Sequence, residues 1–350
     1  MTRTLVSLIG AAAVAATLAA CSGDDAVAAG GEDCAAALAP TAQQVAADAT
    51  ARGLPGGYVL VMKGDQVVCD HAFGSAGSDR NVPIASASKW LTAIAVLTLV
   101  DEGKLSLDEP ISVKLPEFHG AAGQVTLRQL LSHTSGIPST QMCLGDSRNT
   151  LKECTLDISF SPLTNAPGEE FRYGSASFQV AGRLAEIAAG ESWNELFEHR
   201  VSGPLGIPFT GWFGSNPLLA AGGWSTGREY ARVLQMLAGG GRWKGRRILS
   251  DSALARMAHD NVGAARLVLT PRADAHGYGL GAWRDATDAG GAATQISSPG
   301  ASGFYPWVDL KRNLVGIVWI PSRGPDDGFW FAATQQVQAR VRQAYDAGQL

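Results

Sequence analysis

The sequence predicts an α+β fold in which one antiparallel sheet, built from both ends of the chain, is flanked by helices and carries an inserted, mainly helical region. Two observations predict it. A helix and a β-hairpin are expected near the start of the chain, and several strands and a helix near its end. Between them, apolar residues recur at helical spacing. We place the sheet part at about 39–110 and 240–350 and the helical part at about 111–239.

The first elements follow from apolar spacing and from the residues that end each run. Pro40 lies in the first turn of an alanine-rich amphipathic segment and Gly53 follows its end, as is typical of a helix. Alternating runs on either side of a Gly-Asp turn predict a hairpin. The expected elements are a helix over 40–52, strands over 58–63 and 66–73, and a buried helix after Lys89 that ends at Gly103.

The remaining elements are predicted from helical periodicity in the middle of the chain and from turn residues between short apolar runs in its tail. We expect an extended connection over 110–116, a short helix into a turn over 126–138, an irregular segment over 139–166, helices over 176–189, 193–201 and 228–237, strands over 277–283, 294–298, 304–310 and 314–320, and a final helix over 329–347.

Composition bounds the class of protein. With 350 residues and 46% hydrophobic side chains, the chain can form one large domain or two closely joined ones. The formal net charge is −4 and no basic stripe is visible, so we expect no nucleic-acid partner. The sequence favours no particular oligomeric state.

The first residues have the layout of a secretory signal, with a basic start, an apolar run and small residues, and we expect residues 1–20 to be a signal peptide. Leu18-Ala-Ala-Cys21 also looks like a bacterial lipobox, in which the cysteine is lipidated and becomes the new N-terminus. Residues 21–38 are then the lipidated Cys21 and a flexible tether, and 39–350 the folded domain. The alternative is an ordinary signal cleaved near Ala20, with Cys21 merely adjacent.

A lipid on Cys21 predicts where the protein acts. We expect an exported protein that is anchored to the bacterial membrane through this lipid and faces the periplasm or the cell exterior.

Four further cysteines are present, and an even number in an exported chain indicates two disulfides. Cys143 and Cys154 flank a polar loop and are expected to pair, which leaves Cys34 for Cys69. The alternative, a zinc site, is disfavoured because the sequence has neither Cys-x-x-Cys nor a close pair of histidines. We therefore expect no metal and no cofactor.

Ser86 and Lys89 stand three residues apart where the buried helix begins, so they lie on one helix face. Burial and the positive end of the helix lower the pKa of a lysine, so that its amine can accept the proton of the serine. The backbone N–H of Ser86 can then help to hold an oxyanion. The alternative is that Ser86 is an N-cap and Lys89 a solvated residue of the first turn.

Two other residues have both a catalytic and a structural interpretation. Gly223-Trp-Ser-Thr-Gly227 has the form of a Gly-x-Ser-x-Gly nucleophile elbow, which must follow a buried strand. The eight residues that end at Gly223 contain no β-branched side chain, so we interpret Ser225 or Thr226 as an N-cap. His133 has no evident acidic partner in the sequence, and we favour a hydrogen-bonded structural histidine over a catalytic one.

Five motifs, each weak alone, occur together in a specific order: Ser86-Ala-Ser-Lys89, Leu130-Leu-Ser-His-Thr-Ser-Gly136, Pro167-Gly-Glu-Glu-Phe-Arg-Tyr173, Ala221-Gly-Gly-Trp-Ser-Thr226 and Gly300-Ala-Ser-Gly-Phe304. As a set they resemble the serine β-lactamase-like family, which includes class C β-lactamases, D-alanyl-D-alanine carboxypeptidases, family VIII carboxylesterases and 6-aminohexanoate-dimer hydrolases. The resemblance covers about residues 40–345 and implies a β-lactamase/transpeptidase-like fold.

By this resemblance Ser86 is the acylated nucleophile and Lys89 shares its proton. Tyr173 matches the tyrosine of the family's Tyr-x-Asn motif, which acts as a base towards the serine and as an acid towards the leaving group. We expect an adjacent ammonium to lower the pKa of this phenol until it takes part in proton transfer. The backbone N–H groups of Ser86 and Ala301 form the expected oxyanion hole.

The substrate-binding positions depart from the family pattern in two places. Ser175 stands where many members have Asn, and its shorter hydroxyl can still position the lysine but weakens contact with a substrate amide. Ser298-Pro-Gly300 stands where β-lactamases and peptidases have Lys-Thr-Gly or His-x-Gly. The cation that helps to receive a substrate carboxylate is therefore absent, and Pro299 has no N–H to offer. Gly300 still allows close approach of the backbone.

The resemblance and its departures imply a serine hydrolase that acts through an acyl-enzyme on small-molecule ester or amide substrates, as a carboxylesterase does. A β-lactamase or D-Ala-D-Ala carboxypeptidase is the alternative within the same fold. A catalytically idle binding protein of that fold is a further alternative, although nothing structural demands Ser86, Lys89 and Tyr173 together.

Replacing the expected lipidation site tests the anchor. The variant Cys21→Ser should lose its lipid and be released from the membrane fraction, because diacyl and N-acyl chains together hold far more strongly than any single chain. Fractionation of cells that express the wild type and the variant measures this release. Equal membrane association of the two proteins would contradict the lipobox.

Overall fold

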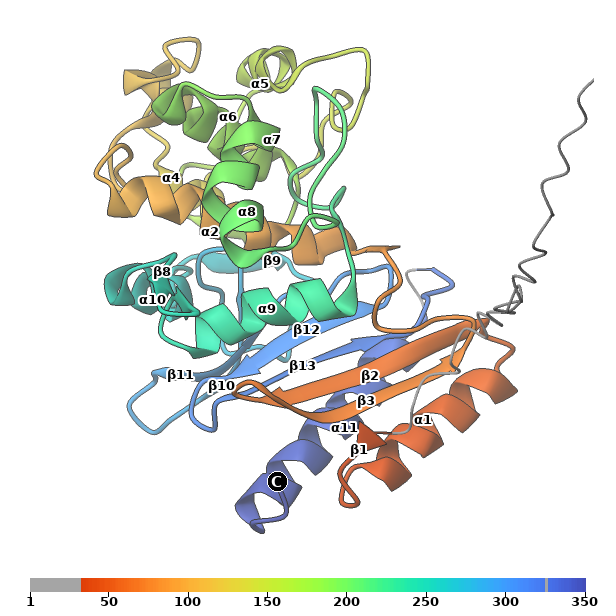
Figure 1. Cartoon of the computed structure of the whole chain (residues 1–350). Coiled ribbons are helices and arrows are strands. Elements are labelled where there is room, and N and C mark those ends of the chain that lie inside the picture. The colour runs from red at the N-terminus through yellow and green to blue at the C-terminus, as the bar shows by residue number, and fades with distance from the viewer. Residues whose placement is uncertain (1–32, 325–326) are drawn as a thin grey trace, which may run out of the picture.

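The computed structural model describes residues 33–324 and 327–350. Its centre is an antiparallel sheet in the strand order β1-β3-β2-β13-β12-β11-β10 (Figure 1). The sheet joins the two ends of the chain where β13 pairs with β2, which confirms the expected α+β fold. The strands are β1 (Asp33–Cys34), β2 (Gly56–Lys63), β3 (Gln66–Gly74), β10 (Trp283–Thr287), β11 (Ala293–Ser297), β12 (Phe304–Asp309) and β13 (Leu314–Trp319).

Helices cover both faces of the sheet. In Figure 1, α1 (Ala39–Ala51) and α11 (Phe329–Asp346) lie below it, and α9 (Gly227–Ala238) and α2 (Ser88–Asp101) lie above it. Successive side chains of a strand point to opposite faces of the sheet, so each strand contributes residues to the hydrophobic core on either face. Tyr58 and Leu60 of β2 join the core of α2 and α9, and the alternate residues Val59 and Val61 join the core of α1 and α11.

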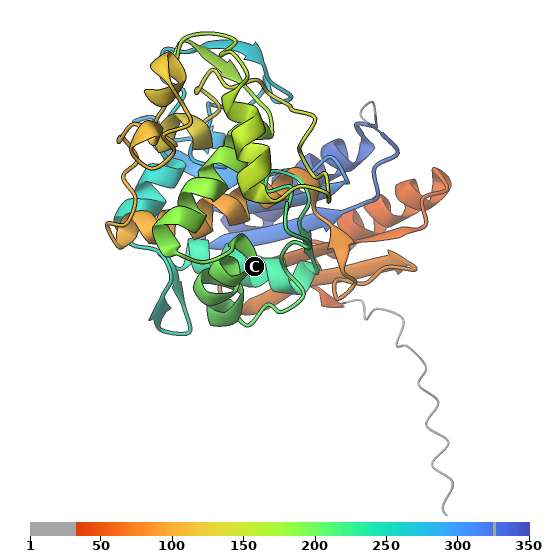
Figure 2. The ribbon, with the colours of Figure 1, turned by 90° about the horizontal axis from the view of Figure 1, so that it is seen from above.

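The helix α2 is deeply buried. Every residue from Ser88 to Leu99 is buried, because the run is apolar on all sides and has contacts all round. Gly103, with a φ of +69°, follows its end, a conformation that glycine adopts without strain. On its far side α2 packs against α6 (Ala176–Ala189), which also contacts α4 (Leu127–Leu131) and α5 (Leu151–Ser159). Figure 2 shows this helical part at one side of the molecule and α1 at the other.

The smaller elements complete the connections. A 3₁₀ turn, η1 (Ala85–Ala87), precedes α2, and three short ladders form away from the central sheet: β4 (Val82–Pro83) with β6 (Trp224–Ser225), β5 (Glu170–Arg172) with β9 (Arg266–Leu269), and β7 (Arg242–Trp243) with β8 (Arg246–Arg247). The remaining helical segments are η2 (Ile111–Val113), α3 (Gly120–Gly123), α7 (Trp193–Phe197), η3 (Glu198–Ser202), α8 (Gly203–Leu205) and α10 (Asp251–Ala258).

Several expected elements differ from the structure. The connection over 110–116 is not extended throughout, because it contains the 3₁₀ turn η2. The segment 139–166 is not wholly irregular: α5 forms there, with Thr150 and Glu153 making a capping box that satisfies its first backbone donors. The strand expected over 277–283 begins only at Trp283. The helix α9, in the segment assigned above to the helical part, packs against β12 and β13 of the sheet.

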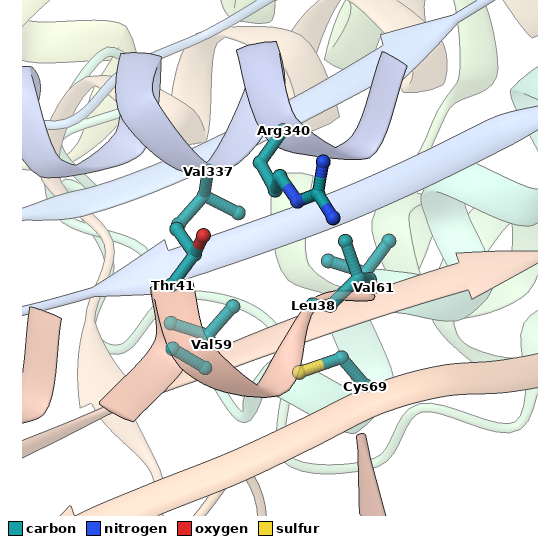
Figure 3. A pocket seen from close by; sticks show the side chains of 8 residues that line it. Leu38, Thr41, Val59, Val61, Cys69, Val337 and Arg340 are labelled. Atoms are coloured by element: carbon teal, nitrogen blue, oxygen red, sulfur yellow. The ribbon is translucent and has the colours of Figure 1, made fainter. Parts of the chain in front are cut away.

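Both expected disulfides are present, Cys34–Cys69 and Cys143–Cys154. The first ties β1 to β3, whose residues Cys34 and Cys69 face each other in register. Beside Cys69, a cavity of about 10 Å³ remains between α1, α11 and the sheet (Figure 3). Its lining is mostly apolar, with Val59, Val61 and Val337 among its residues, and it has room for at most one water molecule.

The expected signal peptide and Cys21 lie outside the described residues. Among the helices of 33–324 and 327–350, none combines the length and the apolar character that crossing a bilayer requires.

Removing the second disulfide should destabilise the helical part. The double variant Cys143→Ala/Cys154→Ala should lose about 3 kcal/mol of unfolding free energy, because the bond closes a short loop in the unfolded chain. Urea unfolding of the oxidised proteins measures the difference, and peptide mapping without reductant checks the pairing in the wild type. Four free thiols, or pairing of Cys34 with Cys143, would contradict the structure.

Candidate active site

Ser86 and Lys89 meet at the junction of η1 and α2. Ser86 is half-buried in the 3₁₀ turn, and Lys89 lies in the first turn of α2 with only 1% of its surface exposed. The Lys89 Nζ lies 3.2 Å from the Ser86 Oγ and donates a hydrogen bond to it. Their spacing of three residues places both on one helix face, as the sequence predicts.

Burial decides the charge of Lys89. Desolvation lowers the pKa of its amine from 10.5 to about 7, because an ammonium loses its hydration inside the protein. The same Nζ donates to the carbonyl oxygen of Ala220 at 3.0 Å and lies 4.4 Å from the centre of the Tyr173 ring. A substantial fraction of Lys89 is therefore neutral at pH 7, and the amine can accept a proton from Ser86.

The segment that supplies the Ala220 carbonyl is fixed to α2 by two further hydrogen bonds. The Thr92 hydroxyl donates to the Leu219 carbonyl oxygen at 2.8 Å, and the Gly223 N–H donates to the Ser88 Oγ at 2.9 Å. Three side chains from the first two turns of α2 thus hold 219–223 across the start of the helix.

Tyr173 follows β5 and is held in place by its backbone and its ring. Its N–H donates to the Leu269 carbonyl oxygen of β9 at 2.8 Å. Its ring stacks on Trp283, with centroids 5.3 Å apart and planes inclined by 29°. Desolvation raises the pKa of Tyr173 from 10.0 to about 12, and interactions of its hydroxyl with the side chains of Ser86 and Trp283 only partly oppose this.

The expectation that an adjacent ammonium lowers the pKa of Tyr173 is therefore wrong. Burial shifts each group towards its neutral form, which lowers the pKa of Lys89 and raises that of Tyr173. Lys89 is the group able to accept a proton near neutral pH, and Tyr173 is the group that carries one to donate.

His133 packs against the ring of Tyr173. Its Nδ1 accepts a hydrogen bond from the Gly174 N–H at 3.4 Å, and its ring centroid lies 4.5 Å from that of Tyr173. Phe171, Phe178 and Tyr278 surround the rest of the ring. Burial, and then the charge of Lys89, lower the pKa of His133 well below its usual value. A neutral, hydrogen-bonded histidine in an aromatic setting fits the structural role favoured from the sequence.

The loop between β11 and β12 lies directly against the turn that carries Ser86. A Cβ on Gly300 would stand 2.0 Å from the Ile84 carbonyl oxygen, so only glycine permits this contact. Ala301 follows Gly300 in the same loop. The expected oxyanion hole requires the N–H of Ala301 and the N–H of Ser86, which belongs to this turn. Ser298 is 2% exposed, and its hydroxyl donates to the Ser86 carbonyl oxygen at 3.2 Å. Its side chain therefore positions Ser86 and does not face a substrate.

The two other serines singled out in the sequence make no hydrogen bond to Ser86 or Lys89. Ser175 is the N-cap residue of α6, and its hydroxyl makes no hydrogen bond to Lys89. The Ala220 carbonyl supplies the contact that was expected of it. Ser225 is fully buried in β6, shares a hydrogen bond with the Thr210 hydroxyl, and precedes the true cap of α9, Thr226. The antiparallel ladder of β6 and β4 is not the strand of a nucleophile elbow.

Sequence reasoning missed three contributors to the site. The Ala220 carbonyl is a backbone group, so no residue type announces it. Trp283 comes from a strand far along the chain from Tyr173. Arg272 is 6% exposed, pairs with Asp274 and Asp285, and donates to the Tyr305 hydroxyl at 3.2 Å. It ties the loop before β10 to β12, and no sequence motif marks this arginine.

A serine beside a partly neutral lysine, a protonated tyrosine and a glycine-lined backbone are the parts needed for acyl transfer. The fold is that of the β-lactamases. The chain belongs to the beta-lactamase family, whose family model matches residues 41–339.

Individual relatives agree with this assignment. A candidate beta-lactamase from Bacteroides dorei DSM 17855 has a crystal structure that superposes with a TM-score of 0.77 at 31% identity, over 85% of this chain and 98% of that one. Esterase EstB of Burkholderia gladioli is 31% identical over 193 residues, 47% of this chain and 49% of its own length. Protein flp of Staphylococcus aureus is 29% identical over 172 residues, 45% of this chain. The match spans only 34% of Protein flp and half of EstB.

The protonation state of Lys89 predicts how activity depends on pH. A lysine with a pKa of about 7 accepts a proton only when it is neutral. The kcat/KM for a nitrophenyl ester should therefore fall about tenfold per unit as pH drops below 7, and level off above it. A profile between about pH 5 and pH 9 measures this, and the same kcat/KM at both extremes would contradict the assignment of Lys89 as the base.

Proposed function

We propose that this protein is an exported, lipid-anchored serine hydrolase that forms an acyl-enzyme on Ser86 and acts on ester or small amide substrates, as a carboxylesterase does. The contact of 3.2 Å between the Lys89 Nζ and the Ser86 Oγ carries the proposal. It places a buried amine with a pKa of about 7 beside the hydroxyl that it needs to deprotonate in the acylation step.

In the proposed acylation step, the Ser86 Oγ attacks the carbonyl carbon of the substrate and passes its proton to the Lys89 Nζ. The carbonyl oxygen becomes an oxyanion, which the N–H groups of Ser86 and Ala301 receive. Tyr173 then donates its proton to the leaving-group oxygen or nitrogen as that bond breaks. The Lys89 ammonium then returns a proton to the Tyr173 oxygen.

Deacylation repeats the same transfers with water. Lys89, neutral again, accepts a proton from the water that attacks the acyl-enzyme, either directly or through Tyr173. The bond between the acyl carbon and the Ser86 Oγ breaks, and the serine recovers a proton from the Lys89 ammonium. The products are a carboxylic acid and the free enzyme, so the cycle balances without a cofactor.

The preference for esters rests on the position of Ser298. The resemblance assigns a cation to this position in β-lactamases and peptidases, and here a buried hydroxyl is bound to the Ser86 carbonyl oxygen instead. The nearby Arg272 cannot replace that cation, because Asp274 and Asp285 already neutralise it. The name of the relative EstB, an esterase, supports the same preference.

A β-lactamase is the second candidate. It is favoured by the Bacteroides dorei relative, because the match spans 98% of that protein's chain. The two candidates differ in what they require of the substrate. A carboxylate beside the scissile bond gains a charge-assisted contact worth about 1.5–3 kcal/mol in a site with a cation. The uncharged site here gives no such gain.

A substrate panel on the folded domain separates these candidates. The domain should hydrolyse nitrophenyl butyrate with a larger kcat/KM than nitrocefin or a D-Ala-D-Ala peptide. Ser86→Ala should reduce turnover by several orders of magnitude, and Lys89→Ala and Tyr173→Phe should be nearly as damaging, because the three residues act as a unit.

The matched control is Ser225→Ala, which removes another buried serine hydroxyl. It should weaken stability by about 1–2 kcal/mol, because the hydroxyl loses its hydrogen bonds to the Thr210 hydroxyl and the Thr226 carbonyl oxygen, and it should leave the rate largely unchanged. Faster hydrolysis of nitrocefin than of nitrophenyl butyrate would make the β-lactamase the better assignment. Full activity in Ser86→Ala would overturn the proposed mechanism itself.

A further inference from the structure

Leu219 is held by side chains of two different helices, although its own segment has no regular structure. Residues 216–223 belong to no helix or strand, so their buried backbone groups need other partners. The Leu219 carbonyl oxygen accepts from the Thr92 hydroxyl of α2 at 2.8 Å, and the Leu219 N–H donates to the Gln179 Oε1 of α6 at 3.1 Å. Thr92, Gln179 and Leu219 are all fully buried.

Gln179 uses its whole amide on this segment. Its Oε1 accepts from the Leu219 N–H, and its Nε2 donates to the Pro217 carbonyl oxygen at 2.7 Å and to the Asn216 Oδ1 at 3.0 Å. The Asn216 Nδ2 donates in turn to the Cys143 carbonyl oxygen at 2.7 Å. A glutamine whose oxygen and amide nitrogen are both engaged cannot turn without losing hydrogen bonds, so Gln179 fixes the path of the segment.

The residue after Leu219 supplies the contact to the base. The Ala220 carbonyl oxygen accepts a hydrogen bond from the Lys89 Nζ at 3.0 Å. This contact stabilises the ammonium more than the neutral amine, because a hydrogen bond from a charged donor is stronger. It also orients the neutral amine. An amine that keeps one N–H on this carbonyl can turn its lone pair towards the Ser86 Oγ, which lies 3.2 Å from the Nζ.

We propose that Gln179 and Thr92 are positioning residues for Lys89, because they hold the Leu219 backbone and thereby keep the Ala220 carbonyl where the amine can use it. The inference rests on the proposed function and deepens it. The hydrogen bonds of both side chains go to the segment and not to Ser86 or Lys89, so both act through the backbone. They would set the proton affinity and the orientation of the base.

The titratable groups around Lys89 allow its protonation to be followed. The Tyr173 ring lies 4.4 Å from the Nζ, and the His133 ring packs against that of Tyr173. Burial raises the pKa of Tyr173 to about 12 and lowers that of His133 well below its usual value. Desolvation is the cause of the lowered pKa of Lys89 itself. A shift in the acid limb of the rate profile near pH 7 therefore reports on Lys89.

The test measures kcat/KM for nitrophenyl butyrate against pH, with active enzyme counted by endpoint labelling of Ser86 with a fluorophosphonate. Thr92→Val removes only the hydroxyl, and Gln179→Met keeps the length of the side chain without its hydrogen bonds. In both, the midpoint of the acid limb should fall by about half a pH unit or more, because the ammonium loses a well-placed acceptor. The limiting kcat/KM at high pH should fall about tenfold, because the lone pair is less well directed. Thr92→Ser, which keeps the hydroxyl, should retain the wild-type midpoint.

Two control variants make the same changes elsewhere. Thr98→Val removes a hydroxyl from the same helix, but this hydroxyl donates to the Ala95 carbonyl oxygen within α2 at 2.7 Å. Gln338→Met replaces a buried glutamine of α11, which lies on the other face of the sheet (Figure 1). Both controls should keep the wild-type midpoint and the wild-type limiting kcat/KM per labelled enzyme. Urea unfolding of each variant separates a loss of stability from a change in the base.

The outcomes distinguish this inference from the proposed function. An unchanged midpoint in Thr92→Val would show a structural role only and would overturn the inference, and so would an equal shift in Thr98→Val. Thr92→Val loses a single hydrogen bond, so the comparison stands even if Gln179→Met, which leaves several partners unpaired, fails to fold. A wild type that hydrolyses no ester and leaves Ser86 unlabelled would instead contradict the proposed function.

Discussion

Burial of the Lys89 amine is the constraint on which the site depends. Only 1% of the surface of this lysine is exposed, so its ammonium form loses the hydration that stabilises a charge in water. The pKa of the amine therefore falls to about 7. What buries it is α2, a helix apolar on every side and packed between the sheet and the helical part. The core that stabilises the fold is therefore the same core that gives the lysine its chemical character.

Close approach of backbones is the second requirement. A Cβ on Gly223 would stand 2.7 Å from the Ser88 Oγ, and one on Gly300 would stand 2.0 Å from the Ile84 carbonyl oxygen. These two glycines allow separate loops to reach the start of α2 from opposite sides. The carbonyl of Ala220 can then bind Lys89, and the loop of Ala301 can lie against the turn of Ser86, although the two segments belong to distant parts of the chain.

The division of acid and base between Lys89 and Tyr173 follows from the same physics. Both groups are desolvated, and desolvation favours the uncharged form of each. An amine becomes a proton acceptor near neutral pH and a phenol remains a donor, with no need for an additional charge in the site. Buried aromatic neighbours such as His133 and Trp283 suit this arrangement, because they orient the tyrosine without introducing a charge.

The sequence alone determined most of the elements and the candidate reacting side chains. Apolar periodicity placed the hairpin, the buried helix and the terminal strands, and a spacing of three residues put Ser86 and Lys89 on one face, because these properties depend on neighbours along the chain. Only the tertiary structure decided the rest. It set the direction of the pKa shift of Tyr173, replaced the expected Ser175 contact with the Ala220 carbonyl, turned Ser298 towards Ser86, and brought Trp283 against Tyr173. Desolvation and contacts between distant segments arise from packing in three dimensions, and no local pattern of residues encodes them.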